Sequence, residues 1–416
     1  MYIMNPIKAL GCRLVQAGFR LAMPVLPYRR PGQLDSVEKV PALLAERQVK
    51  NVLLVTDGGL RRCGVTKKLE EALKAAHIRC TVYDGTCANP TVEHVEDARI
   101  LYRSQGCQAI IAFGGGSAMD CAKALGARIV RPEKKLGQLK GLLRVRKKLP
   151  PLIAIPTTAG TGSEVTPVAV ITDRESFHKY TVLDFALIPS YAVLDPEVTV
   201  SLPPMVTATT GMDALTHAVE AYIGRSTTRR TRALALEATK LIFENLERVW
   251  ANGEEREGRS HLLRAAYLAG EAFSKSYVGY IHAVAHSLGG QYNTPHGLAN
   301  AVIMPYVLED YGPAIHKKLH DLAVAAGIAG AEEPHKAAAE KFIAAIRAMN
   351  RRMGIPETLP GIRREDIPTM ARHAEQEANP LYPVPVLKTQ RELERYYEQI
   401  ADWREGYGQV QLRRAG

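Results

Sequence analysis

The stretch Gly211-Met-Asp-Ala-Leu-Thr-His217 places a carboxylate and an imidazole four residues apart. On a helix, side chains at that spacing share one face. A second stretch, His282-Ala-Val-Ala-His286, repeats the spacing with two imidazoles, and His296 follows ten residues later. One carboxylate and several imidazoles in apolar surroundings suit a divalent transition metal. The sequence therefore predicts a metal site built on helices in this part of the chain.

The metal stretch offers more ligands than a catalytic site needs, since such a site keeps one coordination position open. The five candidates are Asp213, His217, His282, His286 and His296. A zinc-protease helix would carry glutamate after its first histidine, but Ala283 stands there. An isolated Asp-x-x-x-His also occurs as an ordinary hydrogen-bonded pair on a helix. Spacing alone does not decide which histidine is left over.

The chain before this stretch alternates short apolar runs with helical patterns, which predicts a mostly parallel sheet with helices on both faces. The predicted strands are 51–56, 79–83, 108–113, 152–155, 168–171, 180–183 and 191–194. After Pro203-Pro204 strand patterns nearly vanish and long helical patterns follow. We therefore expect a Rossmann-like α/β domain over residues 28–203 and an all-α metal-binding domain over 204–416.

Three turns rich in small or polar residues fall at predicted carboxyl ends of strands, where open α/β sheets bind nucleotides. Gly114-Gly-Gly-Ser117 precedes a helix whose N-terminus attracts phosphate. Pro156-Thr-Thr-Ala-Gly-Thr-Gly-Ser163 follows the strand 152–155. Asp57, after the strand 51–56, suits ribose hydroxyls and would repel a 2′-phosphate. Each turn alone also fits a tight turn or a helix cap, and G-x-G-x-x-G is absent; the combination predicts a dinucleotide site.

Charge and cysteine usage narrow the class of protein. The formal net charge is +11, with nine basic residues against Glu133 between positions 128 and 148. No aromatic residues interleave with these charges, so we expect a solvated face and no nucleic-acid partner. All six cysteines precede residue 122 and none forms a C-x-x-C pair, which favours a reducing, cytoplasmic compartment. No apolar run is long enough to span a membrane.

Residues 1–27 form an N-terminal extension with an amphipathic helical pattern, in which Lys8, Arg13 and Arg20 punctuate apolar residues. A signal peptide would show a longer apolar run and a small-residue cleavage site. A helix packed on its own domain or on a second subunit is the preferred interpretation. Contact with a membrane surface is the alternative.

With these motifs in view, residues 25–405 resemble the iron-containing (group III) alcohol dehydrogenase family. The resemblance lies in four stretches: Gly114–Asp120, Pro156–Glu164, Gly211–Glu220 and His282–Gly297. It implies an N-terminal dinucleotide-binding domain followed by a helical metal domain, in agreement with the change of pattern at Pro203-Pro204. Homodimers are common in such a family, so a homodimer is expected.

The resemblance also implies roles for individual residues. The implied metal ligands are Asp213, His217, His282 and His296, and His286 becomes a catalytic residue near substrate and nicotinamide. The implied cofactor-binding residues are Asp57, Gly115, Gly116, Ser117, Asp120, Thr157, Thr158 and Lys179. Among these, Asp57 is linked to a preference for NAD over NADP.

The expected activity is reversible hydride transfer between a small primary alcohol or diol and NAD, with Fe(II) bound and zinc as the alternative metal. Glycerol dehydrogenases and dehydroquinate synthases share the fold and are the nearest alternatives. A dehydroquinate synthase would need many basic residues around the metal, and few are found. A non-catalytic scaffold bound to membrane or nucleic acid is the remote alternative, and a complete ligand set argues against it.

Overall fold

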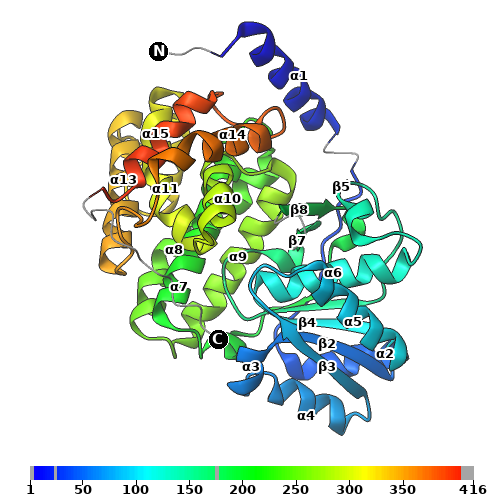
Figure 1. Ribbon diagram of the computed structural model, residues 1–416. Coiled ribbons are helices and arrows are strands. Elements are labelled where there is room, and N and C mark those ends of the chain that lie inside the picture. The colour runs from blue at the N-terminus through cyan, green and yellow to red at the C-terminus, as the bar shows by residue number, and fades with distance from the viewer. Residues whose placement is uncertain (1–3, 23–25, 174–177, 404–416) are drawn as a thin grey trace. The chain divides into compact units, whose positions relative to one another are not determined.

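The structure is a computed structural model that describes residues 4–22, 26–173 and 178–403 (Figure 1). The chain folds into two compact units, which do not follow a single division of the sequence. One unit comprises residues 25–214 and 241–274, and the other comprises residues 1–24, 215–240 and 275–416. Helices from the second half of the sequence therefore belong to both units. The domain boundary expected near residue 203 stays a prediction.

A six-stranded parallel sheet lies at the centre of the unit formed by residues 25–214 and 241–274. Its strands follow the order β1-β9-β6-β4-β2-β3. Their bounds are β1 (Gly32–Leu34), β2 (Asn51–Asp57), β3 (Arg79–Thr86), β4 (Ala109–Gly114), β6 (Leu152–Pro156) and β9 (Tyr191–Val193). The predicted parallel sheet is confirmed. The short edge strand β1 was not predicted.

Helices cover both faces of this sheet, as Figure 1 shows. In β2, Leu53 and Val55 pack with α5 (Val92–Ser104) and α6 (Gly116–Val130). Val52 and Leu54 point to the other face, toward α2 (Val40–Glu46) and α4 (Lys67–Ala75). Successive side chains of a strand alternate between faces, so a strand buried on both sides must be apolar throughout. This explains the uninterrupted apolar run at residues 52–55.

Two predicted strands do not join the main sheet. A separate three-stranded sheet has the order β5-β8-β7, with β5 (Gly141–Leu142), β7 (Val168–Asp173) and β8 (His178–Leu183). Strands β7 and β8 are antiparallel. Only four residues separate them, and a parallel crossover needs a dozen or more. The chain length between the two strands therefore decides their antiparallel pairing.

The second half of the chain is helical, as predicted. Its helices are α7 (Pro204–Ile223), α8 (Arg229–Ala251), α9 (Arg256–Ser276), α10 (Tyr280–Tyr292), α11 (His296–Tyr311), α12 (His316–Ala325), α13 (His335–Arg352), α14 (Ile367–Ala378) and α15 (Gln390–Ile400). In the unit that holds residues 275–416, α14 packs against α10 and α15, and α10 also packs against α11. The α/β-plus-helical fold class is confirmed.

The N-terminal extension contains helix α1 (Pro6–Ala22), which packs on the unit of residues 275–416 through its polar side. Gln16 is 4% exposed, whereas Ile7, Leu14 and Leu21 are 81%, 64% and 79% exposed. Most apolar residues of the helical pattern therefore face outward, whereas Phe19 packs against the ring of Tyr277 with centroids 5.7 Å apart. Within the part of the chain that the structure describes, no helix combines the length and hydropathy needed to cross a membrane.

Most basic residues in the run 128–148 are exposed, as expected, but Arg128 is an exception. Arg128 is 6% exposed and its Nε donates to Glu96 Oε1 at 2.5 Å. Its Nη1 donates to the carbonyl of Arg131, at 2.7 Å. A buried guanidinium needs several acceptors, and local carbonyls with one carboxylate supply them here. At least this cation contributes to packing and not to a binding surface.

Candidate active site

Helix α7 carries two of the predicted metal ligands. Asp213 and His217 are 2% and 5% exposed and lie one helical turn apart. Small and apolar neighbours on α7 let the helix pack closely, and they leave these two polar side chains buried. At the end of α7, Lys318 Nζ donates to the carbonyl of Ile223 at 2.7 Å. This cation satisfies a terminal carbonyl and complements the negative end of the helix dipole.

Helices α10 and α11 carry the other two predicted ligands. His282 lies in the first turn of α10 and is 2% exposed, and His296 is the first residue of α11. Between them, Asn293 adopts the left-handed conformation, with φ 55°, that ends α10. Pro295 precedes α11, where its fixed φ and missing N–H do not disturb the helix. Across this turn the ring of His296 still reaches that of His282, with centroids 5.4 Å apart.

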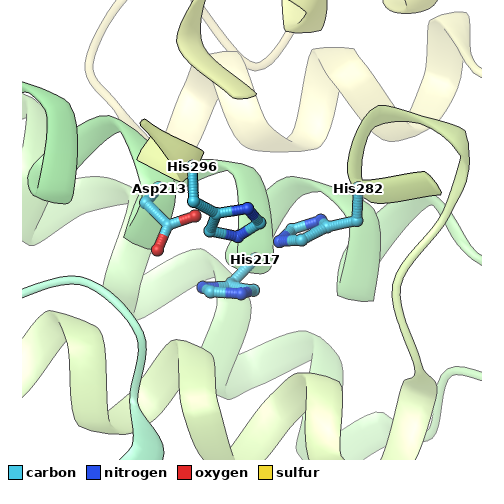
Figure 2. Close-up of side chains that lie close together, drawn as sticks. All are labelled: Asp213, His217, His282 and His296. Atoms are coloured by element: carbon cyan, nitrogen blue, oxygen red, sulfur yellow. The ribbon is translucent and has the colours of Figure 1, made fainter. Parts of the chain in front are cut away.

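The four predicted ligands converge, as Figure 2 shows. One ligand atom from each of Asp213, His217, His282 and His296 lies within 4.8 Å of all the others. The rings of His217 and His282 stack with centroids 4.5 Å apart, and those of His282 and His296 are 5.4 Å apart. Burying a carboxylate among imidazoles is unfavourable unless a cation or hydrogen bonds compensate. The arrangement could hold a metal ion.

The donor set fits a divalent transition metal. Three imidazole nitrogens and one carboxylate oxygen suit Fe(II) and also suit zinc. Burial lowers the pKa of His282 well below its ordinary value, and the neighbouring imidazoles lower it further. Both effects favour the neutral imidazole, which is the form that binds a metal. As ligands of a metal, the four residues stay a prediction, to which this geometry gives support.

Glu220 fixes the orientation of His282. Its Oε2 lies 2.6 Å from His282 Nδ1 and accepts the N–H of Gly279 at 2.7 Å. Its Oε1 accepts the N–H of Ile281 at 2.8 Å. Burial raises the pKa of Glu220 to about 8, and the hydrogen bonds from Gly279 and Ile281 act against that increase. With Nδ1 engaged by Glu220, Nε2 is the nitrogen that His282 can offer to a metal.

His286 lies beside the four-residue cluster and is not one of its members. Its side chain is 41% exposed, and its ring stacks on His296 with centroids 5.2 Å apart. His286 Nδ1 lies 2.6 Å from Glu377 Oε1, which also accepts the hydroxyl of Tyr382 at 2.7 Å. Burial would raise the pKa of Glu377, but the His286 charge and these hydrogen bonds outweigh it and hold that pKa below its usual value. An ionised carboxylate therefore faces His286.

The predicted cofactor turns lie together at the carboxyl edge of the six-stranded sheet. Strands β4 and β6 pair with Gly114 opposite Pro156. A Cβ on Gly115 would lie 3.5 Å from Thr158 Oγ1, and one on Gly114 would lie 3.8 Å from Asp57 Oδ2. Gly114, with φ +155°, cannot be replaced without strain, since its Cβ would lie 2.7 Å from that of Ala118. Gly114, absent from the predicted site residues, is the glycine that this turn most requires.

The glycine turn leads into α6. Gly116 is the first residue of α6, and Ser117 follows it. The first N–H groups of a helix lack partners within the helix and attract anions. Thr157 is 2% exposed and its N–H donates to the carbonyl of Gly114 at 3.1 Å, so its backbone joins the two turns.

Asp57 and Asp120 accept hydrogen bonds from backbone N–H groups of the protein, so each has a structural role that does not require a cofactor. Asp57 Oδ1 caps α3 (Gly58–Arg62) by accepting the N–H groups of Gly59 and Leu60 at 2.8 and 3.0 Å. Asp120 Oδ2 accepts the N–H of Val170 at 3.1 Å. Burial raises the pKa of Asp120 above its ordinary value, against the nearby charge of Lys123. Their roles in cofactor binding stay predictions.

Lys179 lies in β8, paired with Thr172 of β7. Its side chain falls outside the described part of the structure, so its role also stays a prediction. A different lysine is prominent instead, and sequence reasoning missed it. Lys123 of α6 is fully buried, and its Nζ donates to Ser163 Oγ and to the carbonyls of Thr166 and Val168, each at 2.9 Å.

Sequence reasoning also missed Glu220 and Glu377. Glu220 lies seven residues after Asp213, and positions i, i+4 and i+7 share one helical face, so the spacing could have indicated it. No local pattern marks Glu377, because it reaches His286 from a helix 91 residues away in sequence.

Comparisons with known proteins identify the family. The model of "Iron-containing alcohol dehydrogenase" matches residues 32–196, and that of "Fe-containing alcohol dehydrogenase family, C-terminal" matches residues 207–401. The 1,3-propanediol dehydrogenase of Klebsiella pneumoniae is 40% identical over 336 residues, which is 79% of this chain and 86% of the relative. The NAD-dependent methanol dehydrogenase of Bacillus methanolicus is 35% identical over 341 residues, 82% of this chain and 89% of the relative.

A solved structure agrees in fold as well as in sequence. The crystal structure of a 1,3-propanediol oxidoreductase superposes with a TM-score of 0.86 at 36% identity, and the match covers 90% of this chain and 99% of the other. The predicted resemblance and the predicted class of enzyme are confirmed. The two family models lie on either side of residues 197–206 and together span both the nucleotide turns and the buried Asp–His cluster. The chain is an oxidoreductase that belongs to the iron-containing alcohol dehydrogenase family.

Proposed function

We propose that this protein catalyses reversible hydride transfer between a small primary alcohol or diol and NAD, with the aldehyde as the oxidised product. The observation that carries the proposal is the convergence of Asp213, His217, His282 and His296 within 4.8 Å. The relatives named for 1,3-propanediol and for NAD-dependent methanol oxidation support the substrate class and the cofactor.

In this proposal the four-residue cluster holds Fe(II), with zinc as the alternative. When bound, the metal supplies a Lewis acid that polarises an alcohol or aldehyde oxygen. Glu220 holds His282 in one orientation and one tautomer, which keeps the ligand set preorganised. The low exposure of Asp213, His217 and His282 excludes water from most of the site and strengthens electrostatic interactions there.

His286 is the proposed proton carrier. Its exposed side chain lies against His296, so it can exchange a proton with substrate or with water. Glu377 engages Nδ1, so Nε2 is the nitrogen that takes up or releases the proton. The carboxylate also stabilises the imidazolium that forms when Nε2 is protonated.

Cofactor binding is assigned to the carboxyl edge of the six-stranded sheet. The N–H groups of Gly115, Gly116 and Ser117, at the start of α6, suit the pyrophosphate. The other proposed contacts come from Asp57, Asp120, Thr157, Thr158 and Lys179. Asp57 Oδ1 is used in capping α3, so Oδ2 is the oxygen proposed for the ribose hydroxyls. Its negative charge favours NAD over NADP.

A reducing compartment, the cytoplasm, is the proposed location, because all six cysteines are free in the structure. A homodimer is the proposed assembly, from the family resemblance. Residues 1–27 are assigned to packing on the protein itself, supported by the polar contacts of α1, and no nucleic-acid partner is proposed.

The metal assignment is tested with His282→Ala, using His320→Ala as the matched control. His320 is also a buried histidine, 7% exposed, but its ring contacts that of His335 edge-on, and it is not in the cluster. Purified proteins are compared for bound iron and zinc, and for NADH oxidation with short aldehydes. We expect loss of metal and of activity in the first variant only. Full activity and metal content in His282→Ala would overturn the assignment.

Cofactor choice is tested by comparing kcat/KM for NADH and NADPH in the wild-type protein and in Asp57→Ser. Serine keeps a helix-capping oxygen but removes the negative charge. We expect the wild type to prefer NADH and the variant to accept NADPH more readily. An NADPH preference in the wild type would refute the role of Asp57.

A further inference from the structure

Polar side chains of α1 contact a short segment of the protein, residues 375–385. Gln16 Nε2 donates to the carbonyls of Tyr382 and Pro380 at 2.7 and 3.3 Å. Arg13 Nη1 donates to the carbonyl of Val384 at 2.7 Å. Gln16 is 4% exposed, and a buried amide needs such partners. The N-terminal helix therefore supplies hydrogen bonds to backbone that has left α14 and has not yet entered α15.

Two further contacts attach α1 to the same segment. Arg13 Nη2 donates to the carbonyl of Pro385 at 3.0 Å. Lys8 Nζ lies 2.6 Å from Glu375 Oε1, near the end of α14. Arg13 and Gln16 also bond to each other, at 2.8 Å, so the two side chains act as one unit. These contacts span the segment from its first residue to its last.

The segment held by α1 carries the groups that face His286. Tyr382, whose carbonyl accepts from Gln16, donates its own hydroxyl to Glu377 Oε1 at 2.7 Å. The same oxygen of Glu377 lies 2.6 Å from His286 Nδ1. A continuous series of contacts therefore leads from Gln16 through Tyr382 and Glu377 to the imidazole. All of these residues belong to the unit of residues 1–24, 215–240 and 275–416.

The chemistry of the contact determines the tautomer of His286. An ionised carboxylate only accepts hydrogen bonds, so the proton at this contact must sit on His286 Nδ1. In the neutral ring Nε2 then carries a lone pair and can accept a proton. Without Glu377, the ring would lose the carboxylate that keeps its proton on Nδ1, so the proton could sit on either nitrogen.

We propose that Glu377 is a positioning residue that fixes the orientation and tautomer of His286, and that helix α1 holds Glu377 in place through Tyr382. The consequence for catalysis rests on the role given to His286 in the proposed function. The positioning itself does not depend on that role. The N-terminal extension thus serves the active site through the segment 375–385.

The first experiment measures the tautomer directly, by ¹⁵N NMR of the histidine rings in the metal-free protein. His286→Gln assigns the His286 signals, and Glu365→Gln serves as a control at a surface glutamate. We expect Nδ1–H in the wild type, and a mixture or the Nε2–H form in Glu377→Leu. Glu377→Gln keeps an acceptor oxygen and should retain Nδ1–H. Identical His286 signals in the wild type and both Glu377 variants would overturn the positioning.

Kinetics on the metal-loaded enzyme then separate this proposal from the proposed function. We expect Glu377→Leu to lower kcat about tenfold or more, with little change in KM or metal content, and Glu377→Gln to recover part of it. If the tautomer changes but kcat does not, the positioning stands and the catalytic role of His286 fails. If the wild type oxidises no small alcohol at all, the proposed function itself fails.

The second experiment tests the contribution of α1 in the full-length chain. Arg13→Met combined with Gln16→Leu removes the hydrogen bonds to residues 380–385, and Leu14→Gln changes the exposed side of the same helix as a control. We expect backbone amides of residues 378–385 to exchange hydrogen about tenfold faster or more in the double variant. The control should match the wild type. Unchanged exchange in the double variant would refute the contribution of α1.

Discussion

Replacing Glu220 with alanine removes the carboxylate that contacts His282. Glu220 is 3% exposed, accepts the N–H groups of Gly279 at 2.7 Å and Ile281 at 2.8 Å, and lies 2.6 Å from His282 Nδ1. The substitution leaves two buried backbone N–H groups without an acceptor, at a cost of about 1–3 kcal/mol each. The cavity left by the side chain adds to this loss. We expect the free energy of unfolding of the metal-free protein to fall by about 3–6 kcal/mol.

The same substitution should weaken metal binding beyond its effect on stability. Without Glu220, the ring of His282 can rotate and can place its proton on Nε2, the nitrogen assigned to the metal. Loss of a carboxylate behind a histidine ligand typically reduces metal affinity about 10–100-fold. Affinity is measured by competition with a chelator at a temperature where the variant is folded, and stability is measured by denaturant unfolding of the metal-free protein.

Phe342→Ala separates the two effects. Phe342 is a fully buried residue of α13, a helix that carries none of the four ligands. Its truncation should cost about 3–5 kcal/mol, comparable to Glu220→Ala. The folded fraction of Phe342→Ala should bind metal with wild-type affinity. Equal affinities for the two variants, or a stability loss below about 1 kcal/mol in Glu220→Ala, would refute the reasoning.

Three further predictions concern stability. Lys123→Met should lower the free energy of unfolding by about 3 kcal/mol or more, because Thr166 and the other acceptors of the buried ammonium lose a charged donor. Denaturant unfolding measures this, and a loss under about 1 kcal/mol would contradict the prediction. Gly114→Ala should cost about 1–3 kcal/mol and raise KM for the cofactor, since the new Cβ would lie 2.7 Å from that of Ala118; wild-type stability and KM would count against it. Burial lowers the pKa of Lys318 from 10.5 to about 8, so between these pH values only the unfolded chain keeps the proton. The unfolding free energy of the wild type relative to Lys318→Met should therefore rise over that window, and a flat or falling difference would disprove the assignment.

Much of the α/β half could be predicted because its signals are local. An apolar run such as Val52–Val55 must be buried on both faces, and regular helical patterns between such runs require parallel pairing. The main sheet and its covering helices followed from this. Which strands pair with one another was harder to predict from the sequence. Strands β7 and β8 pair antiparallel in a separate sheet because the connection between them is short. The alternation of strand and helix patterns contains no information about that pairing.

In the candidate site, too, some features follow from local sequence and others depend on tertiary packing. Asp213 and His217 share a helical face, so their proximity is set by the helix repeat and is visible in sequence. That His282 and His296 join them, and that His286 does not, depends on how α10, the turn at Asn293 and α11 fold back. Spacing alone left five candidates, and the family resemblance reduced them to the four that the structure brings together.

The sequence by itself determined the fold class, the glycine and threonine turns and the types of residue in the Asp–His cluster, because helix period, strand alternation and glycine turns are properties of neighbouring residues. Only the tertiary structure decided which groups act on those residues. Glu377 reaches His286 across 91 positions, and Gln16 reaches Tyr382 across 366. Such contacts arise when helices pack, and no local pattern records them. The candidate metal ligands can therefore be recognised in the sequence, whereas the hydrogen bonds that orient the histidines depend on how the helices pack.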